Sequence, residues 1–134
     1  MTDPNENRTA YSGPAIAASL SLLLAFLTLM ITHHISRLTP TLDKWVHGYG
    51  YWIPGSRGSG PDGSIGSYSG KETLALGVWL GSWLILHILW RKQELALQTW
   101  TRLFVIGLAL ITLGFFHPLA DPIVLFIAGW FGLP

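Results

Sequence analysis

Three long apolar runs dominate the pattern of hydrophobic and polar positions along the chain. They cover residues 14–36, 71–91 and 99–117, and the stretch from Thr73 to Trp90 contains no Asp, Glu, Lys or Arg. An α-helix rises ~1.5 Å per residue, so about 20 residues cross a hydrocarbon core ~30 Å thick. The sequence therefore predicts an all-α membrane protein with three transmembrane helices.

Local signals indicate where these spans begin. Pro14 suits the first turn of a helix, because its missing N–H would have no partner there. Ser69 and Glu72 have the spacing of a capping box just ahead of the second run. We therefore expect the first span to start beside Pro14 and the second to be capped by Ser69.

Small residues four positions apart predict two faces for helix packing. Such spacing lines them up on one side of a helix, where another helix can approach closely. The first span carries one set and the second span a GxxxG pair, namely Ala17, Ser21 and Ala25, and Gly77 and Gly81.

Residues 37–70 form a loop in two parts. Thr39 followed by Pro40 is a helix-start signal. Four apolar or aromatic residues then recur at helical spacing, Leu42, Trp45, Val46 and Tyr49. This pattern predicts a short amphipathic helix in the membrane interface. The remainder, rich in glycine, serine and proline, is typical of a connector.

The two ends of the chain differ in character. Residues 1–13 are polar and are expected to form a tail. At the other end, Asp121 and Pro122 are expected to start a short hydrophobic helix over 122–133. About eleven apolar residues extend only ~16 Å, so this helix is predicted to be interfacial or re-entrant. A kinked continuation of the third span is the alternative.

The charged residues indicate how the chain is oriented in the membrane and argue against nucleic acid as a partner. Arg91, Lys92 and Arg102 flank the short hairpin 91–102, which places it on the cytoplasmic side by the positive-inside rule. The N-terminus is then also cytoplasmic, and the long loop lies outside. A net charge of +1 without a basic block argues against nucleic acid. The absence of cysteine excludes disulfides and thiol catalysis.

Four of the five histidines are expected on the outer side, namely His33, His34, His47 and His117. His34 (or His33) with His117 would have the similar depth that a bis-histidine haem requires. The four together, with Asp43 or Asp121, could instead bind zinc or copper. The plain alternative is hydrogen bonding to headgroups, water or backbone.

His87 lies within an apolar run and is therefore a second candidate site. With Trp83 one turn away, its imidazole could be an axial ligand of a chlorophyll magnesium or contact a carotenoid. The alternative is a histidine near the inner interface that hydrogen-bonds to a neighbouring helix. The bound cofactor, if there is one, stays unidentified.

Nothing in the sequence predicts an enzyme. The acidic residues are spread over both sides, and no nucleophile is paired with a base. Residues 58–63 match GxGxxG, but neither the strand nor the helix of a dinucleotide site flanks them. No charged residue lies in the middle of a span, which argues against a proton pump.

One stretch carries a resemblance. GSYSGKETLALGVWLGSWLILHILWRKQE (66–94), together with LTLMITHHIS (27–36), resembles small uncharacterised membrane proteins of cyanobacteria over most of residues 11–117. The resemblance implies a photosynthetic host and a thylakoid or plasma membrane, but no residue roles. We expect a non-catalytic accessory or assembly subunit of a larger, photosynthetic membrane complex. Its partners would be the lipid bilayer and other membrane subunits, and haem or chlorophyll binding is the alternative.

Overall fold

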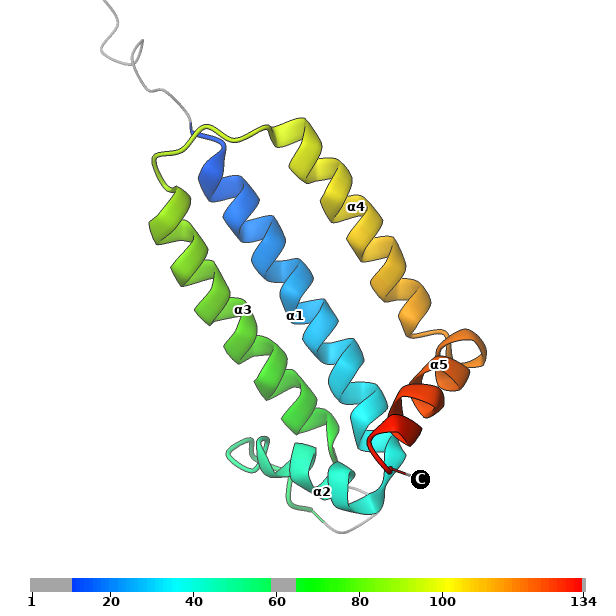
Figure 1. Cartoon of the computed structure of the whole chain (residues 1–134). Coiled ribbons are helices and arrows are strands. Elements are labelled where there is room, and N and C mark those ends of the chain that lie inside the picture. The colour runs from blue at the N-terminus through cyan, green and yellow to red at the C-terminus, as the bar shows by residue number, and fades with distance from the viewer. Residues whose placement is uncertain (1–10, 59–64, 134) are drawn as a thin grey trace, which may run out of the picture.

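The computed structural model describes residues 11–58 and 65–133, which form five α-helices (Figure 1). They are α1 (Gly13–Leu38), α2 (Pro40–Gly48), α3 (Tyr68–Trp90), α4 (Leu97–Gly114) and α5 (His117–Trp130). No strand occurs in these two ranges. The all-α prediction is confirmed for them, whereas most of the predicted tail and of the GxGxxG match lies outside the described residues.

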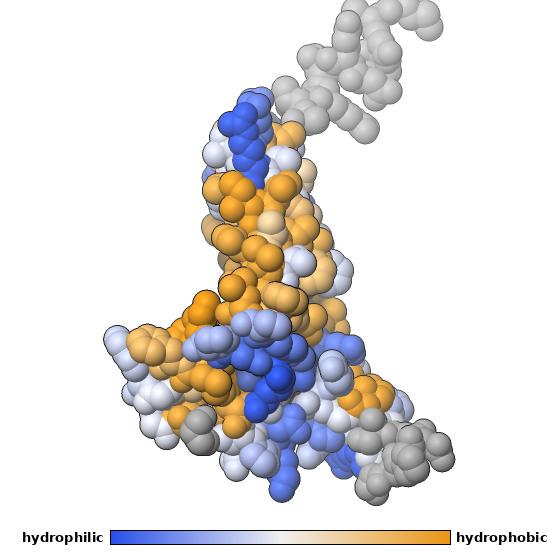
Figure 2. All heavy atoms as spheres, turned by 90° about the vertical axis from the view of Figure 1, so that its right-hand side faces the viewer, coloured by the Kyte–Doolittle hydropathy of each residue, from blue (hydrophilic) through white to orange (hydrophobic). Residues whose placement is uncertain are grey.

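Helices α1, α3 and α4 are long and apolar enough to cross a membrane. Their 26, 23 and 18 residues correspond to about 39, 35 and 27 Å, close to or above the ~30 Å of a hydrocarbon core. On the face shown in Figure 2, hydrophobic residues form a band between polar ends. Length and hydropathy thus confirm three candidate membrane spans and indicate a membrane location.

The three long helices form an open layer with α1 in the middle (Figure 1). Helix α1 packs against α3 and against α4, whereas the backbones of α3 and α4 stay apart and these two helices meet at the hairpin end, where the rings of Trp90 and Trp100 lie 5.5 Å apart. Only α1 has an appreciable buried fraction in its apolar stretch, and α3 has none. Lipid chains can cover these apolar faces, whereas in water the same faces would be a very large exposed hydrophobic surface.

The predicted packing residues have different surroundings. Ala17 and Ser21 of α1 are completely buried, and Ala25 is half-buried. Gly77 and Gly81 of α3 are exposed, and no described atom lies within 4 Å of where a Cβ would be. A packing role for this glycine pair stays a prediction, and it would need another chain.

The start of α1 is tied to the hairpin between α3 and α4. Ser12 Oγ donates to the Leu95 carbonyl and accepts from the Leu95 N–H, both at 2.7 Å. Gly13 N–H donates to the Gln93 carbonyl at 3.0 Å, and a Cβ on Gly13 would collide with the Trp90 backbone. Pro14 lies in the first turn as predicted.

At the other end, α2 lies across the ends of α1 and α3 (Figure 1). The Thr39 hydroxyl accepts a hydrogen bond from the Leu42 N–H at 3.1 Å, which confirms the predicted helix start. Val46 is completely buried, and its carbonyl lies so close to Gly70 that a side chain there would clash. The interfacial position of α2 remains a prediction.

The predicted capping box is wrong. Helix α3 begins at Tyr68, so Ser69 is inside its first turn. Ser69 Oγ donates to the Gly66 carbonyl at 2.9 Å instead of accepting from the backbone ahead of it. Gly66 has a positive φ of 61°, and this left-handed turn lets the connector enter the helix before Ser69.

The predicted start of the C-terminal helix is also wrong. Helix α5 begins at His117 and contains Asp121 and Pro122, because the Phe116 carbonyl accepts from the N–H groups of Leu119 and Ala120. The backbone is extended at Phe116, which separates α5 from α4. Its 14 residues extend about 21 Å, still less than a hydrocarbon core. Its interfacial or re-entrant position stays a prediction.

Candidate functional site

Charged and histidine side chains of α1 and α5 meet at the end of the layer where α2 lies. We call this group the polar cluster, and it consists of His33, His34, Arg37, His117 and Asp121. Helix α1 supplies three members from its last two turns, and α5 supplies two that are four residues apart. An i, i+4 spacing puts the latter two on one face of α5.

His34 is the buried member, with 6% of its surface exposed. Its Nε2 lies 2.7 Å from the carbonyl oxygen of Gly114 at the end of α4. A carbonyl only accepts, so Nε2 carries a proton, and in the neutral ring Nδ1 keeps a free lone pair. That Nδ1 is 3.8 Å from Asp121 Oδ1.

His117 has both ring nitrogens engaged. Nδ1 contacts Arg37 Nη1 and lies 3.4 Å from Asp121 Oδ1. Arg37 Nη1 also lies 3.2 Å from Nε2, but its shorter contact is to Nδ1. A guanidinium group only donates, so in the neutral ring Nδ1 is the acceptor and the proton is on Nε2. Nε2 is 3.4 Å from His33 Nε2, and the two rings stack with centroids 5.2 Å apart.

Arg37 is the cation of the polar cluster. Its Nη1 is 3.3 Å from Asp121 Oδ1 and also contacts His117. Two imidazole nitrogens and a carboxylate therefore lie close together, with the positive charge of Arg37 in contact with them. Arg37 was not singled out from the sequence, although it lies four residues after His33, on the same helix face.

The structure brings some of the histidines that were candidate metal ligands together and places His47 elsewhere. One ligand atom each from His34, His117 and Asp121 lie within 4.8 Å of one another. His33 contacts His117 through the two Nε2 atoms. His47 is elsewhere, with Nε2 2.6 Å from the Ser56 carbonyl and its ring against Tyr51.

The haem prediction stays open, but this arrangement does not favour it. His33 and His117 have their Nε2 atoms 3.4 Å apart, less than the about 4 Å that two metal–nitrogen bonds would span. Nε2 of His34 is already bound to Gly114. The side chains as placed leave no gap for a porphyrin between two imidazoles.

The pigment candidates lie at the opposite end of α3. His87 is in the last turn of that helix, and its ring lies 5.5 Å from that of Trp83 with a tilt of 33°. No second ring or charged group is recorded against His87 in the described part of the chain. Pigment binding here stays a prediction that an absorption spectrum of the purified protein tests.

A second feature is an open groove along the layer. Its floor is formed by Ala18, Ser19 and Leu22 of α1, and its volume is about 510 Å³. Trp79, Leu80 and Trp83 of α3 line one wall, and Phe104 of α4 lines the other. We call it the central groove. It exists because α3 and α4 do not meet over the small residues of α1.

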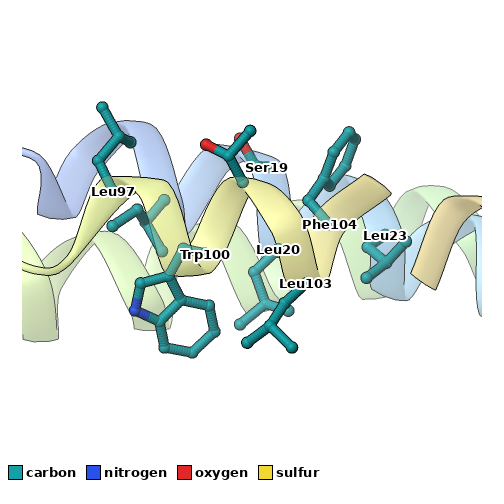
Figure 3. Close-up of a pocket in the computed structure, with 9 residues that line it drawn as sticks. Ser19, Leu20, Leu23, Leu97, Trp100, Leu103 and Phe104 are labelled. Carbon is teal, nitrogen blue, oxygen red and sulfur yellow. The ribbon is translucent and has the colours of Figure 1, made fainter. Parts of the chain in front are cut away.

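The contact between α1 and α4 is also loose. A gap of about 100 Å³ lies between these helices. Figure 3 shows Leu20 from α1 with Trp100 and Leu103 from α4 on one side of the layer, whereas Phe104 points to the other.

Comparison with protein-family models, with curated proteins and with solved structures finds no match to this chain. The central groove and the polar cluster are the two features of the described residues that bear on its function.

Proposed function

We propose that this chain is a non-catalytic integral membrane subunit that binds a transmembrane helix of another protein in its central groove. The single observation that carries the proposal is the open layer, in which α3 and α4 flank α1 and do not pack against each other along the groove. A closed three-helix bundle would have covered the same surfaces by itself.

The lining of the groove suits a helix. In lipid, helices associate through close packing over small residues rather than through hydrophobicity. Ala18 and Ser19 provide such a floor. Trp79 and Trp83 stand beside it with 40% and 41% of their surfaces exposed, and large rigid rings contribute strongly to contacts.

The subunit would lie in a thylakoid or plasma membrane with the hairpin 91–102 on the cytoplasmic side. Arg91, Lys92 and Arg102 support this orientation under the positive-inside rule. The polar cluster and α2 would then be at the outer surface. Photosynthetic partners follow from the resemblance of the sequence and remain part of the proposal.

Site-specific photo-crosslinking tests the proposal. A benzophenone amino acid is placed at Trp83, in the groove, or at Ile106 of α4, which is 57% exposed and does not line the groove. We expect one discrete adduct with another membrane protein from position 83 in native membranes, and none from position 106. Ala18→Phe, which fills the floor, should abolish the adduct.

Equal or diffuse labelling from both positions would contradict the proposal, because it would mean that lipid alone occupies the groove. An adduct of twice the mass of the chain would show that the helix in the groove belongs to a second copy of this protein and not to another protein.

A further inference from the structure

We propose that His34, His117 and Asp121 form a binding site for a divalent transition-metal ion of the zinc type, and that Arg37 occupies this site when the ion is absent. The site is independent of the central groove and goes beyond the proposed subunit role.

The distances are close to those of a tetrahedral site. Bonds of 2.0–2.1 Å to zinc place ligand atoms about 3.3 Å from one another. Asp121 Oδ1 lies 3.4 Å from His117 Nδ1 and 3.8 Å from His34 Nδ1. All three ligand atoms fall within 4.8 Å. Small side-chain rotations would therefore close the site without moving either helix.

The orientation of both imidazoles is already set. Metal-binding histidines usually donate their second N–H to a carbonyl or another acceptor, which fixes the tautomer. His34 does so to the Gly114 carbonyl at 2.7 Å. His117 has His33 Nε2 at 3.4 Å as the corresponding acceptor. Both Nδ1 atoms are then on the side of Asp121, 3.8 and 3.4 Å from its Oδ1.

The ligand set selects the kind of ion. Two imidazoles and one carboxylate suit zinc and its neighbours, whereas magnesium and calcium prefer oxygen ligands alone. Three protein ligands leave the fourth position of a tetrahedron for water. A hollow of about 100 Å³ lined by His34, Arg37 and Asp121 lies beside the ligands and provides the space.

Arg37 acts as the competing cation. Two lone pairs and a carboxylate facing one another would repel without a positive charge among them, and the guanidinium group supplies it. Its side chain is 45% exposed, so it can turn away toward the membrane surface. The ion and Arg37 cannot occupy the same place, so removing Arg37 should tighten metal binding.

The test uses the full-length chain in detergent, titrated with Co²⁺ and followed by its visible d–d absorption. Zn²⁺ affinity is then measured by competition with a chromogenic chelator. We expect one ion per chain with a tetrahedral cobalt spectrum. Arg37→Gln should bind about tenfold more tightly, and His34→Ala and Asp121→Asn about 100-fold more weakly. His33→Ala should lower the Zn²⁺ affinity 10–100-fold, as is typical when the hydrogen-bond partner of a metal-binding histidine is removed.

His47→Ala is the matched control, because this histidine is not part of the cluster, and it should bind Zn²⁺ like the parent protein. Absence of a cobalt spectrum in both the parent protein and Arg37→Gln would overturn the site. Weaker binding by Arg37→Gln would overturn the competing role of Arg37. A loss in His47→Ala equal to that in His34→Ala would show that the bound ion is elsewhere. The gain expected for Arg37→Gln cannot arise from misfolding.

Discussion

The buried imidazole of His34 donates a hydrogen bond to the backbone carbonyl of Gly114, which joins α1 to the end of α4 across eighty residues of sequence. The last carbonyls of a helix have no partner within that helix, and this bond satisfies one of them. At Gly114 a side chain would press on the end of the Met30 side chain, which would have to move aside. The same bond orients the ring that faces Asp121.

Removing this hydrogen bond should destabilise the protein. His34→Ala leaves a carbonyl at the end of α4 without its donor, which costs about 1–3 kcal/mol. We expect a lower midpoint of thermal unfolding in detergent, measured by circular dichroism. His87→Ala is the control, since the His87 ring makes no hydrogen bond to any residue in ranges 11–58 and 65–133, and it should unfold near the parent midpoint. Equal midpoints for both variants would argue against a structural role of the bond.

Glycines at contacts and glycines on the open face should respond in opposite ways to alanine. At Gly13 a methyl group would collide with the Trp90 backbone, which cannot move aside as a flexible side chain can, so Gly13→Ala should lower stability. In Gly77→Ala and Gly81→Ala the new methyl group meets no described atom within 4 Å, and each variant should gain up to ~1 kcal/mol of stability from helix propensity. Thermal unfolding of the isolated chain in detergent measures both.

A loss of stability in Gly77→Ala or Gly81→Ala would show that the isolated chain already packs on this face, contrary to the structure. Normal stability together with loss of a partner in native gels would assign the pair to contacts with another chain.

Ser12 should hold the hairpin between α3 and α4. Ser12→Ala removes the two hydrogen bonds to Leu95, each worth about 0.5–1.5 kcal/mol. We expect faster amide hydrogen exchange at Gln93 and Leu95. Ser19→Ala provides the comparison, because that hydroxyl bonds only to Ala15 within its own helix. Unchanged exchange in Ser12→Ala would mean that other contacts hold the hairpin.

The protein should be recovered with membranes. Three helices with largely exposed apolar faces need lipid or detergent around them. After high-speed centrifugation and a carbonate wash at alkaline pH we expect the full-length chain in the pellet. Folded protein in the supernatant without detergent would overturn the membrane assignment and the orientation that follows from it.

Much of the fold could be predicted because it depends on local physics. The length of an apolar run sets whether a helix can span a bilayer, and all three expected spans are present as helices. The cap at Thr39 could also be predicted, since its hydroxyl accepts from a backbone N–H only three residues further along the chain. The predictions of where α3 and α5 begin were wrong, because the carbonyls of Gly66 and Phe116, which lie ahead of the expected start signals, accept the hydrogen bonds of the first turns.

The sequence by itself determined the number of apolar helices, their lengths and the presence of histidines near one end, since these follow from periodicity and helix rise. Only the tertiary structure decided that His34, His117 and Asp121 approach one another, that Arg37 lies among them and that His47 does not. Those contacts require α5 to fold back against α1, and residues more than eighty positions apart are brought together by packing that no local pattern encodes.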